Sequence, residues 1–266
     1  MTALNFYGNG LPNLVDSVLP GKFIVIEGTD GVGRSTQIAL LREWLESRGY
    51  AVGSTGLSRS LLAGDAIKKA KDGHTLSEST LALFYATDLA DRLEHEIIPA
   101  LRAGMVVLTD RYLYSIIARA QVRGVDARWA RRMFGFALMP DAVFYLKADV
   151  AHLIPRVLGD QGFDYWESGM DYLKGSSVFR NFVKYQTQLL AQFDAISEEF
   201  NFRVIDANRS VRETFYDLRR EIGAVVSDLK KQPIEEPAVP TDDVKAKEAE
   251  EGAEVKKDEV KESASS

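Results

Sequence analysis

The chain has 266 residues, no cysteine and three histidines, and 45% of its residues are hydrophobic. Without cysteine it has no disulfide, no thiolate metal site and no cysteine nucleophile. Of its 39 acidic and 33 basic residues, eleven acids and five lysines lie from residue 235 onward, which leaves 28 of each before that point. This neutral body argues against a protein whose main task is to bind the nucleic acid backbone.

The sequence divides into three parts. Residues 1–20 are expected to be an N-terminal extension, residues 21–229 one folded domain, and residues 230–266 a disordered acidic tail, because the last part has many charges and no aromatic residue. No basic start is followed by an apolar run, and no window approaches the roughly 18 apolar residues of a membrane span. We therefore expect a cytoplasmic protein with neither a membrane nor a nucleic acid partner.

Strands and helices alternate along the predicted domain. Residues 22–27, KFIVIE, form an apolar run typical of a buried strand, and residues 35–48 show helical spacing of apolar side chains. Further helices are expected at 80–103, from about 115, and at 151–158, 177–200 and 210–229, and further strands at 105–110, 142–148 and 202–207. Apolar strands between helices predict an α/β three-layer fold, with a parallel sheet of about five strands and helices on both faces.

A glycine-rich stretch, EGTDGVGRSTQ, follows the first predicted strand. Gly28, Gly33 and Ser35 match the phosphate-binding loop G-x-x-x-x-G-K-[ST], and Arg34 takes the place of the lysine. Such a loop points backbone N–H groups and a helix N-terminus at phosphate oxygens. We assign to nucleotide binding Gly28, Thr29, Asp30, Gly31, Val32, Gly33, Arg34, Ser35 and Thr36, together with Arg209.

Arg34 raises a question about catalysis. It keeps the positive charge of lysine but presents a planar, wider and bidentate group. Two outcomes stay open: the guanidinium contacts the γ-phosphate from a shifted position and supports transfer, or it holds the nucleotide in a non-productive pose. In either case binding should survive better than turnover.

Three segments together resemble one family, the thymidylate kinases: the glycine-rich stretch, LFYATDLADRLEHEIIPALRAGMVVLTDRYLYSIIA, and PDAVFYLKADV. The resemblance spans about residues 21–229. It implies a P-loop α/β nucleoside monophosphate kinase that uses ATP and Mg²⁺ to phosphorylate a nucleoside monophosphate. The acceptor that we expect is dTMP, which would give dTDP. The resemblance also implies an arginine-bearing lid and a homodimer.

The resemblance assigns roles to several positions. Asp30 matches a carboxylate that meets the acceptor sugar, and Ser115 matches a hydroxyl beside the acceptor. Asp110 and Arg111 match a pair near the metal and the acceptor phosphate, so Ser35 and Asp110 are the expected Mg²⁺ ligands. The expected catalytic residues are Arg34, Asp110, Arg111 and Arg156.

Four positions depart from the family pattern. TGLSR replaces T-R-E-P-G, which puts Gly56 at an arginine position and Arg59 three residues later. Leu89 stands where an arginine reads the thymine carbonyl. The segment after DRY reads ARAQ and includes Arg119, and the lid keeps Arg156 upstream but has Tyr165 at an arginine position.

These departures leave alternatives open. Arg59 either takes over the acceptor phosphate or the phosphate is held less well. Tyr85 either stacks on the base or belongs to the core, and Arg119 is either a pocket cation or a surface residue. For the whole protein, the alternatives to a dTMP kinase are a nucleotide-binding protein with little or no turnover and a kinase re-targeted to another acceptor.

Overall fold

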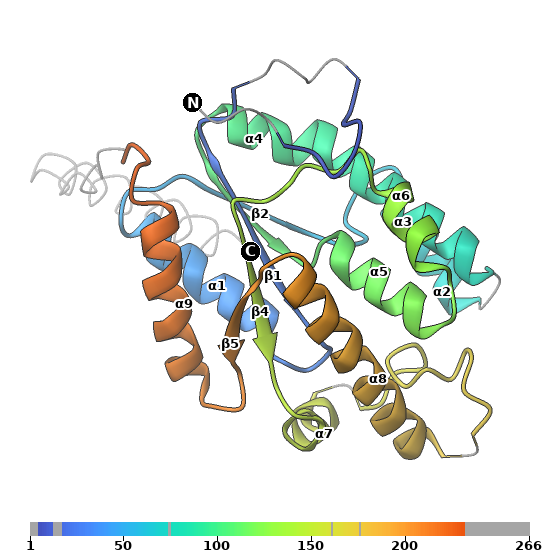
Figure 1. Ribbon diagram of the computed structural model, residues 1–266. Helices are drawn as coiled ribbons and strands as arrows, with labels where there is room; N and C mark the ends of the chain where they lie inside the picture. The colour runs from blue at the N-terminus through green and yellow to red at the C-terminus, as the bar shows by residue number, and fades with distance from the viewer. Residues whose placement is uncertain (1–4, 13–17, 74–75, 161, 176, 232–266) are drawn as a thin grey trace, which may run out of the picture. The chain divides into compact units, whose positions relative to one another are not determined.

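Five parallel strands form the central sheet (Figure 1). The computed structural model describes residues 5–12, 18–73, 76–160, 162–175 and 177–231. The strands are β1 (Lys22–Gly28), β2 (Val52–Gly56), β3 (Val106–Asp110), β4 (Ala142–Lys147) and β5 (Arg203–Asp206). Their order is β2-β3-β1-β4-β5, and every neighbouring pair is parallel. The predicted α/β fold is confirmed.

The strand register brings the ends of three strands to one edge. Asp110, the last residue of β3, pairs with Ile26 of β1 on one side and with Gly56, the last residue of β2, on the other. Because β1 lies between β3 and β4, the chain order of the strands reverses beside β1. In open α/β sheets, ligands bind at the carboxyl ends of the strands at such a reversal. The glycine-rich loop leaves β1 at this place.

Helices cover both faces of the sheet (Figure 1). One face carries α1 (Arg34–Glu46) and α9 (Val211–Val225), and the other carries α3 (Glu78–Arg92), α4 (Ile98–Arg102), α5 (Leu113–Val122) and α8 (Val178–Glu199). The remaining helices are α2 (Gly64–Asp72), α6 (Ala127–Met133) and α7 (Val150–Gly159). No helix among the described residues is both long enough and apolar enough to cross a membrane.

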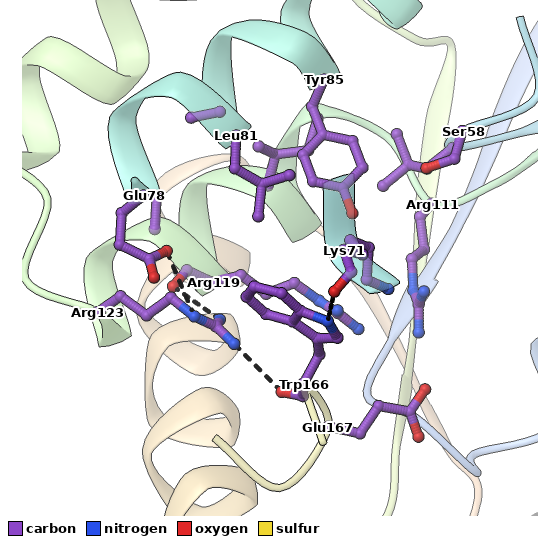
Figure 2. A pocket seen from close by; sticks show the side chains of 14 residues that line it. Ser58, Lys71, Glu78, Leu81, Tyr85, Arg111, Arg119, Arg123, Trp166 and Glu167 are labelled. Atoms are coloured by element: carbon purple, nitrogen blue, oxygen red, sulfur yellow. Dashed lines mark hydrogen bonds and ion pairs between the residues drawn. The ribbon is translucent and has the colours of Figure 1, made fainter. Parts of the chain in front are cut away.

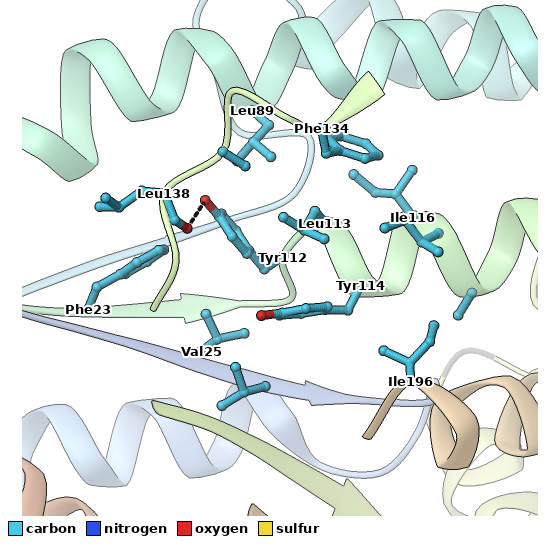
Figure 3. Close-up of a cluster of buried hydrophobic side chains, with 14 of the residues drawn as sticks. Phe23, Val25, Leu89, Tyr112, Leu113, Tyr114, Ile116, Phe134, Leu138 and Ile196 are labelled. Atoms are coloured by element: carbon cyan, nitrogen blue, oxygen red, sulfur yellow. Dashed lines mark hydrogen bonds between the residues drawn. The ribbon is translucent and has the colours of Figure 1, made fainter. Parts of the chain in front are cut away.

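Alternation along β1 divides the core in two. Phe23 and Val25 join the cluster beneath α3, α5 and α8, whereas Ile24 and Ile26 join the cluster beneath α1 and α9. This follows from the period of two in a strand. Figure 3 shows the first cluster around Tyr112, whose buried hydroxyl donates to the Leu138 carbonyl at 2.9 Å.

The predicted helix at 80–103 is interrupted. It consists of α3, a π-helical turn η1 (Leu93–Ile97), and α4. Pro99 has no N–H to donate to the carbonyl of His95, and its ring crowds that carbonyl. A wider π turn just before the proline accommodates this defect.

The N-terminal extension packs on the domain where it is described. Phe6 pairs antiparallel with Leu138, and the Tyr7 N–H donates to the Ala137 carbonyl at 3.1 Å. The hydroxyls of Tyr7 and Tyr114 are hydrogen-bonded, and Leu11 is buried in the core. The predicted acidic tail lies, from residue 232 onward, outside the described residues.

Candidate active site

The loop between β1 and α1 has the backbone of a phosphate cradle. Gly28, Gly31 and Gly33 have φ angles of 149°, 75° and 94°. A Cβ at Gly28 would lie 2.7 Å from the Leu146 carbonyl oxygen, and one at Gly31 would lie 2.6 Å from Val157, so only glycine fits these positions. The buried side chains below the loop, which leave mainly backbone groups for a phosphate, are Thr29, Asp30 and Val32.

Arg34 begins α1 and folds back beneath the loop. Its side chain is only 9% exposed, and its Nε donates to Asp110 Oδ1 at 2.7 Å. Its Nη1 donates to the Gly28 carbonyl at 2.6 Å and also to the Thr29 carbonyl. Because the guanidinium is a rigid fork, one side chain makes all of these bonds at once. Arg34 therefore ties the phosphate loop to the end of β3.

Asp110 is held between Arg34 and Ser35. Ser35 Oγ donates to its Oδ2 at 3.1 Å, on the other side from the Arg34 bond. Burial raises the pKa of Asp110, but the charges of Arg34 and Arg111 and the bonds from Arg34 and Ser35 outweigh it, and the pKa is lowered. The carboxylate and the exposed Ser35 hydroxyl are oxygen donors that fit Mg²⁺, an ion that usually keeps several waters.

No group of three or more acidic or histidine side chains among the described residues is placed to hold a metal ion. Two protein oxygens suit Mg²⁺ bound together with substrate phosphates rather than in an all-protein cage. Arg34 already forms an ion pair with Asp110, so a metal ion that binds this carboxylate must share it with the guanidinium.

Asp30 forms ion pairs with two of the predicted site residues, Arg111 and Arg119. Arg119 Nη2 lies 2.8 Å from each of its oxygens, and Arg111 is ion-paired to it as well. Burial raises the pKa of Asp30, but the two arginines outweigh it and the pKa is well below its usual range. Arg111 has a φ of 68°, an uncommon left-handed conformation for a residue other than glycine. The strand end thus holds a strained arginine beside the loop.

A cavity of about 130 Å³ lies between α3, α5 and the segment 163–175 (Figure 2). The Tyr85 hydroxyl points into it, and the half-buried ring stands in its wall. Trp166 lies across the cavity from α3, and Arg111 and Glu167 close one side. The other lining residues are Leu57, Ser58, Lys71, Glu78, Leu81, Ala82, Ile116, Arg119, Ala120 and Arg123.

Two positions compared with the family's acceptor pocket, the departure Leu89 and the predicted contact Ser115, have buried side chains. Leu89 is 0% exposed and belongs to the hydrophobic core. Ser115 is also fully buried, and its hydroxyl donates to Glu27 at 2.5 Å. Glu27 in turn accepts the Tyr112 N–H at 2.9 Å, and burial raises its pKa above the usual value. Ser115 therefore supports the start of α5 from below, and its hydroxyl does not reach an acceptor in this arrangement.

The Arg59 side chain occupies the space beside Gly56, where another residue would place its Cβ. A Cβ at Gly56 would be 3.1 Å from both Cζ and Nε of Arg59, and 3.1 Å from the Asp110 carbonyl oxygen. Arg59 also lines a second cavity of about 450 Å³, which shares Ser58, Lys71 and Trp166 with the first. At the tip of the same turn, the Leu61 side chain is fully exposed, at 101%.

Arg123 is a pocket residue that the sequence predictions missed. It donates to Asp171 at 2.6 and 3.1 Å, to the Tyr185 hydroxyl at 3.0 Å and to the carbonyls of Trp166 and Arg119. These bonds join α5, the segment 163–175 and α8 and use all five donors of the guanidinium. Its position four residues after Arg119, on the same helical face, was the available signal.

Two carboxyl groups in the cavity wall were also missed. Burial raises the pKa of Glu78 to about 7, with Arg123 opposing and Asp171 adding to the shift. Burial likewise raises the pKa of Glu167 to about 7, where Asp30 adds to the shift. Both groups therefore titrate near neutral pH within an otherwise cationic pocket. Only the folded structure places them beside other carboxylates.

Arg156 and Arg209 lie together near the end of β5. Arg156 Nη2 donates to the Ala207 carbonyl at 2.9 Å, and Arg209 is ion-paired with Asp217 of α9. Arg156 is on α7, which packs against Gly31 of the phosphate loop through Val157. No bond from either arginine to the cluster around Asp110 is found among the described residues. Arg156 Nη2 also lies 3.5 Å from the Arg209 carbonyl oxygen.

Comparison with known proteins gives a consistent picture. The sequence profile of the thymidylate kinase family matches residues 26–218. The chain is 36% identical over 208 residues to "Probable thymidylate kinase 2" of Saccharolobus solfataricus, which covers 77% of this chain and 97% of that protein. It is 31% identical over 219 residues to the "Thymidylate kinase" of Shouchella clausii, covering 79% and 98% of the two chains. The chain belongs to the thymidylate kinase family.

Proposed function

We propose that this nucleoside monophosphate kinase transfers the γ-phosphoryl group of ATP to dTMP, giving ADP and dTDP. The observation that carries the proposal is the meeting of two sites at one sheet edge. The glycine loop with Arg34 and Asp110 adjoins the cavity with Arg111, Arg119 and Tyr85. The relatives named as thymidylate kinases support dTMP as the acceptor.

The donor side is assigned from the loop. The backbone of residues 28–36 holds the phosphates of ATP, and Ser35 and Asp110 would hold Mg²⁺. Arg209 and Arg156 bind the nucleotide from the end of β5. When bound, Mg²⁺ would neutralise part of the negative charge of the phosphates. In this proposal Arg34 turns from Asp110 toward a phosphate oxygen, because phosphoryl transfer depends mostly on positioning and charge.

The acceptor side is assigned from the cavity. Tyr85 stacks on the base, and Asp30 orients the sugar while Arg119 and Arg111 hold Asp30 in place. Arg59 binds the acceptor phosphate from the position next to Gly56. The acceptor phosphate oxygen then attacks the γ-phosphorus as the bond to the β-phosphate oxygen breaks. A homodimer and a cytoplasmic location belong to the same proposal by family resemblance.

Two alternatives have specific support. The ion pair between Arg34 and Asp110 favours a nucleotide-binding protein with little turnover, because the catalytic cation is already bound. The burial of Leu89 and the apolar Ile116 and Ala120 in the cavity wall favour a kinase re-targeted to another acceptor. In both cases the fold and the loop stay the same.

The test is ADP release with ATP and Mg²⁺ and each common ribo- and deoxyribonucleoside monophosphate in turn. We expect turnover with dTMP above all others. Preference for another monophosphate would establish re-targeting. ATP binding by calorimetry without turnover of any monophosphate, in the wild type and in Arg34→Lys, would establish a binding protein instead.

A further inference from the structure

The turn that carries Arg59 is fixed from below by one buried carboxylate. Asp88 of α3 accepts the Ser58 N–H at 3.0 Å through Oδ2 and the Ser60 N–H at 2.9 Å through Oδ1. The two amides flank Arg59 on either side. Ser58 has a φ of 60°, which reverses the chain at this point. The direction of the Arg59 side chain is therefore set by a clamp on its neighbours.

Asp88 is in turn held by a buried arginine. Arg92 Nε lies 3.0 Å from Asp88 Oδ2, and both side chains are 0% exposed. Taking such a pair out of water is costly, so a buried ion pair is weak evidence for stability. The two Nη atoms of Arg92 are buried and have no hydrogen-bond partner among the described residues. In the described part of the chain, the one side-chain hydrogen bond of Arg92 therefore goes to the clamp.

Within the described part of the chain, no other contact anchors Arg59. None of the hydrogen bonds and ion pairs found among the described residues involves its guanidinium, and the residue is exposed. Yet its Nε and Cζ lie over Gly56, beside the last residue of β3. A long exposed side chain loses much rotamer freedom when it is held in one place. Because Asp88 already fixes the backbone beside Arg59, ligand binding has to order only the side chain. The entropy lost on binding is therefore smaller.

We propose that Asp88 and Arg92 are positioning residues for the acceptor phosphate. They fix the turn at residues 57–60 so that Arg59 meets the phosphate from above Gly56, in place of an arginine on the strand end itself. The inference rests on the proposed function in that it needs a monophosphate acceptor. It does not depend on which base the acceptor carries or on how fast it turns over.

The experiment measures the dissociation constant of dTMP and of the other monophosphates by calorimetry, and the KM values where there is turnover. Asp88→Asn should weaken acceptor binding about tenfold, because Asn is uncharged and keeps a single side-chain oxygen, so one of the two amides flanking Arg59 loses its hydrogen-bond acceptor. The KM for ATP should stay unchanged. In an Arg59→Ala background, Asp88→Asn should add almost nothing. Glu94→Gln, which removes an exposed charge from the same helical segment, is the matched control.

A second variant covers loss of folding. Removing one partner of a buried ion pair is strongly destabilising, whereas replacing both partners is better tolerated. The double change Asp88→Asn with Arg92→Met should therefore fold and still show the weakened acceptor binding. Independent effects of Asp88→Asn and Arg59→Ala, which multiply when combined, would overturn the inference. So would a wild type that binds no monophosphate.

A wild type that binds a monophosphate without turnover would contradict the proposed function alone. The coupling between positions 88 and 59 would then still be decided by the dissociation constants.

Discussion

The donor half and the acceptor half of the site differ in how they depart from the family pattern. In the donor half, the loop from Gly28 to Ser35 keeps its backbone and changes one cation, Arg34. In the acceptor half, the cations stand on new positions, with Arg59 beside Gly56 and Arg119 on Asp30. A phosphate site built from backbone amides is little affected by substitutions, because the fold sets the positions of those amides. A pocket built from side chains can exchange its charged residues when others reach the same space.

Arg34 should show the largest effect of any single residue. Arg34→Ala removes the cation and leaves Asp110 without its ion pair, so we expect kcat to fall by about 100- to 1,000-fold, as when one electrostatic stabiliser is lost. Arg34→Lys should lose less, because it keeps a positive charge. Coupled ADP release measures both. An Arg34→Ala variant with wild-type kcat would show that catalysis does not use the positive charge at this position.

Arg59 should affect the acceptor alone. Arg59→Ala is expected to raise the KM for the monophosphate by about 10- to 100-fold, since a charge-assisted hydrogen bond contributes about 1.5–3 kcal/mol. Gly56→Ala should raise it by a smaller factor, because the new Cβ would come within 3.1 Å of the Arg59 guanidinium. Lys69→Ala, on an exposed position of α2, serves as the control. An equal change in the KM for ATP would contradict the division into two halves.

Arg156 should matter less than the family pattern implies. Its guanidinium already donates to the Ala207 carbonyl, so Arg156→Ala is expected to lower kcat by at most about tenfold. Steady-state kinetics at saturating ATP and dTMP measure this. A loss as large as that of Arg34→Ala would show that Arg156 leaves Ala207 and joins the reaction.

Glu78 should make stability depend on pH. Its pKa is about 7 in the folded chain against 4.5 as the ordinary value, so the folded state binds more protons and stability falls as pH rises from about 4.5 through 7. Glu78→Gln removes this loss, and we expect its Tm to exceed that of the wild type by about 2–4 °C at pH 8. The difference should be much smaller at pH 5 and should vanish only below about pH 4.5. Thermal unfolding between pH 5 and 8 tests it, and a constant difference would contradict it.

Most strands could be predicted because they are uninterrupted apolar runs. The expected strand at 105–110 is β3, Val106–Asp110, and the one at 142–148 is β4, Ala142–Lys147. Strand β2 has the sequence VGSTG, which contains no such apolar run, so the sequence does not predict it. The short helices α2 and α6 were also missed, since nine and seven residues are too few for a clear period.

The candidate site divides in the same way. The loop could be recognised because its function depends on consecutive residues. Arg123, Glu78 and Glu167 could not, because their importance comes from neighbours that are distant in the sequence, such as Asp171 and Asp30. Ser115 was placed correctly on α5, yet its hydroxyl turns inward to a buried Glu27 that no local pattern reveals.

The fully exposed Leu61 at the tip of the Arg59 turn also offers a practical handle. Since the chain has no cysteine, Leu61→Cys would create its single thiol, and a fluorescent label would attach there alone. The label would sit two residues from Arg59, outside the buried clamp. Its emission would follow the turn as nucleotides arrive, in a protein otherwise unmodified by the dye. The order in which the two substrates bind would then be followed in real time by fluorescence.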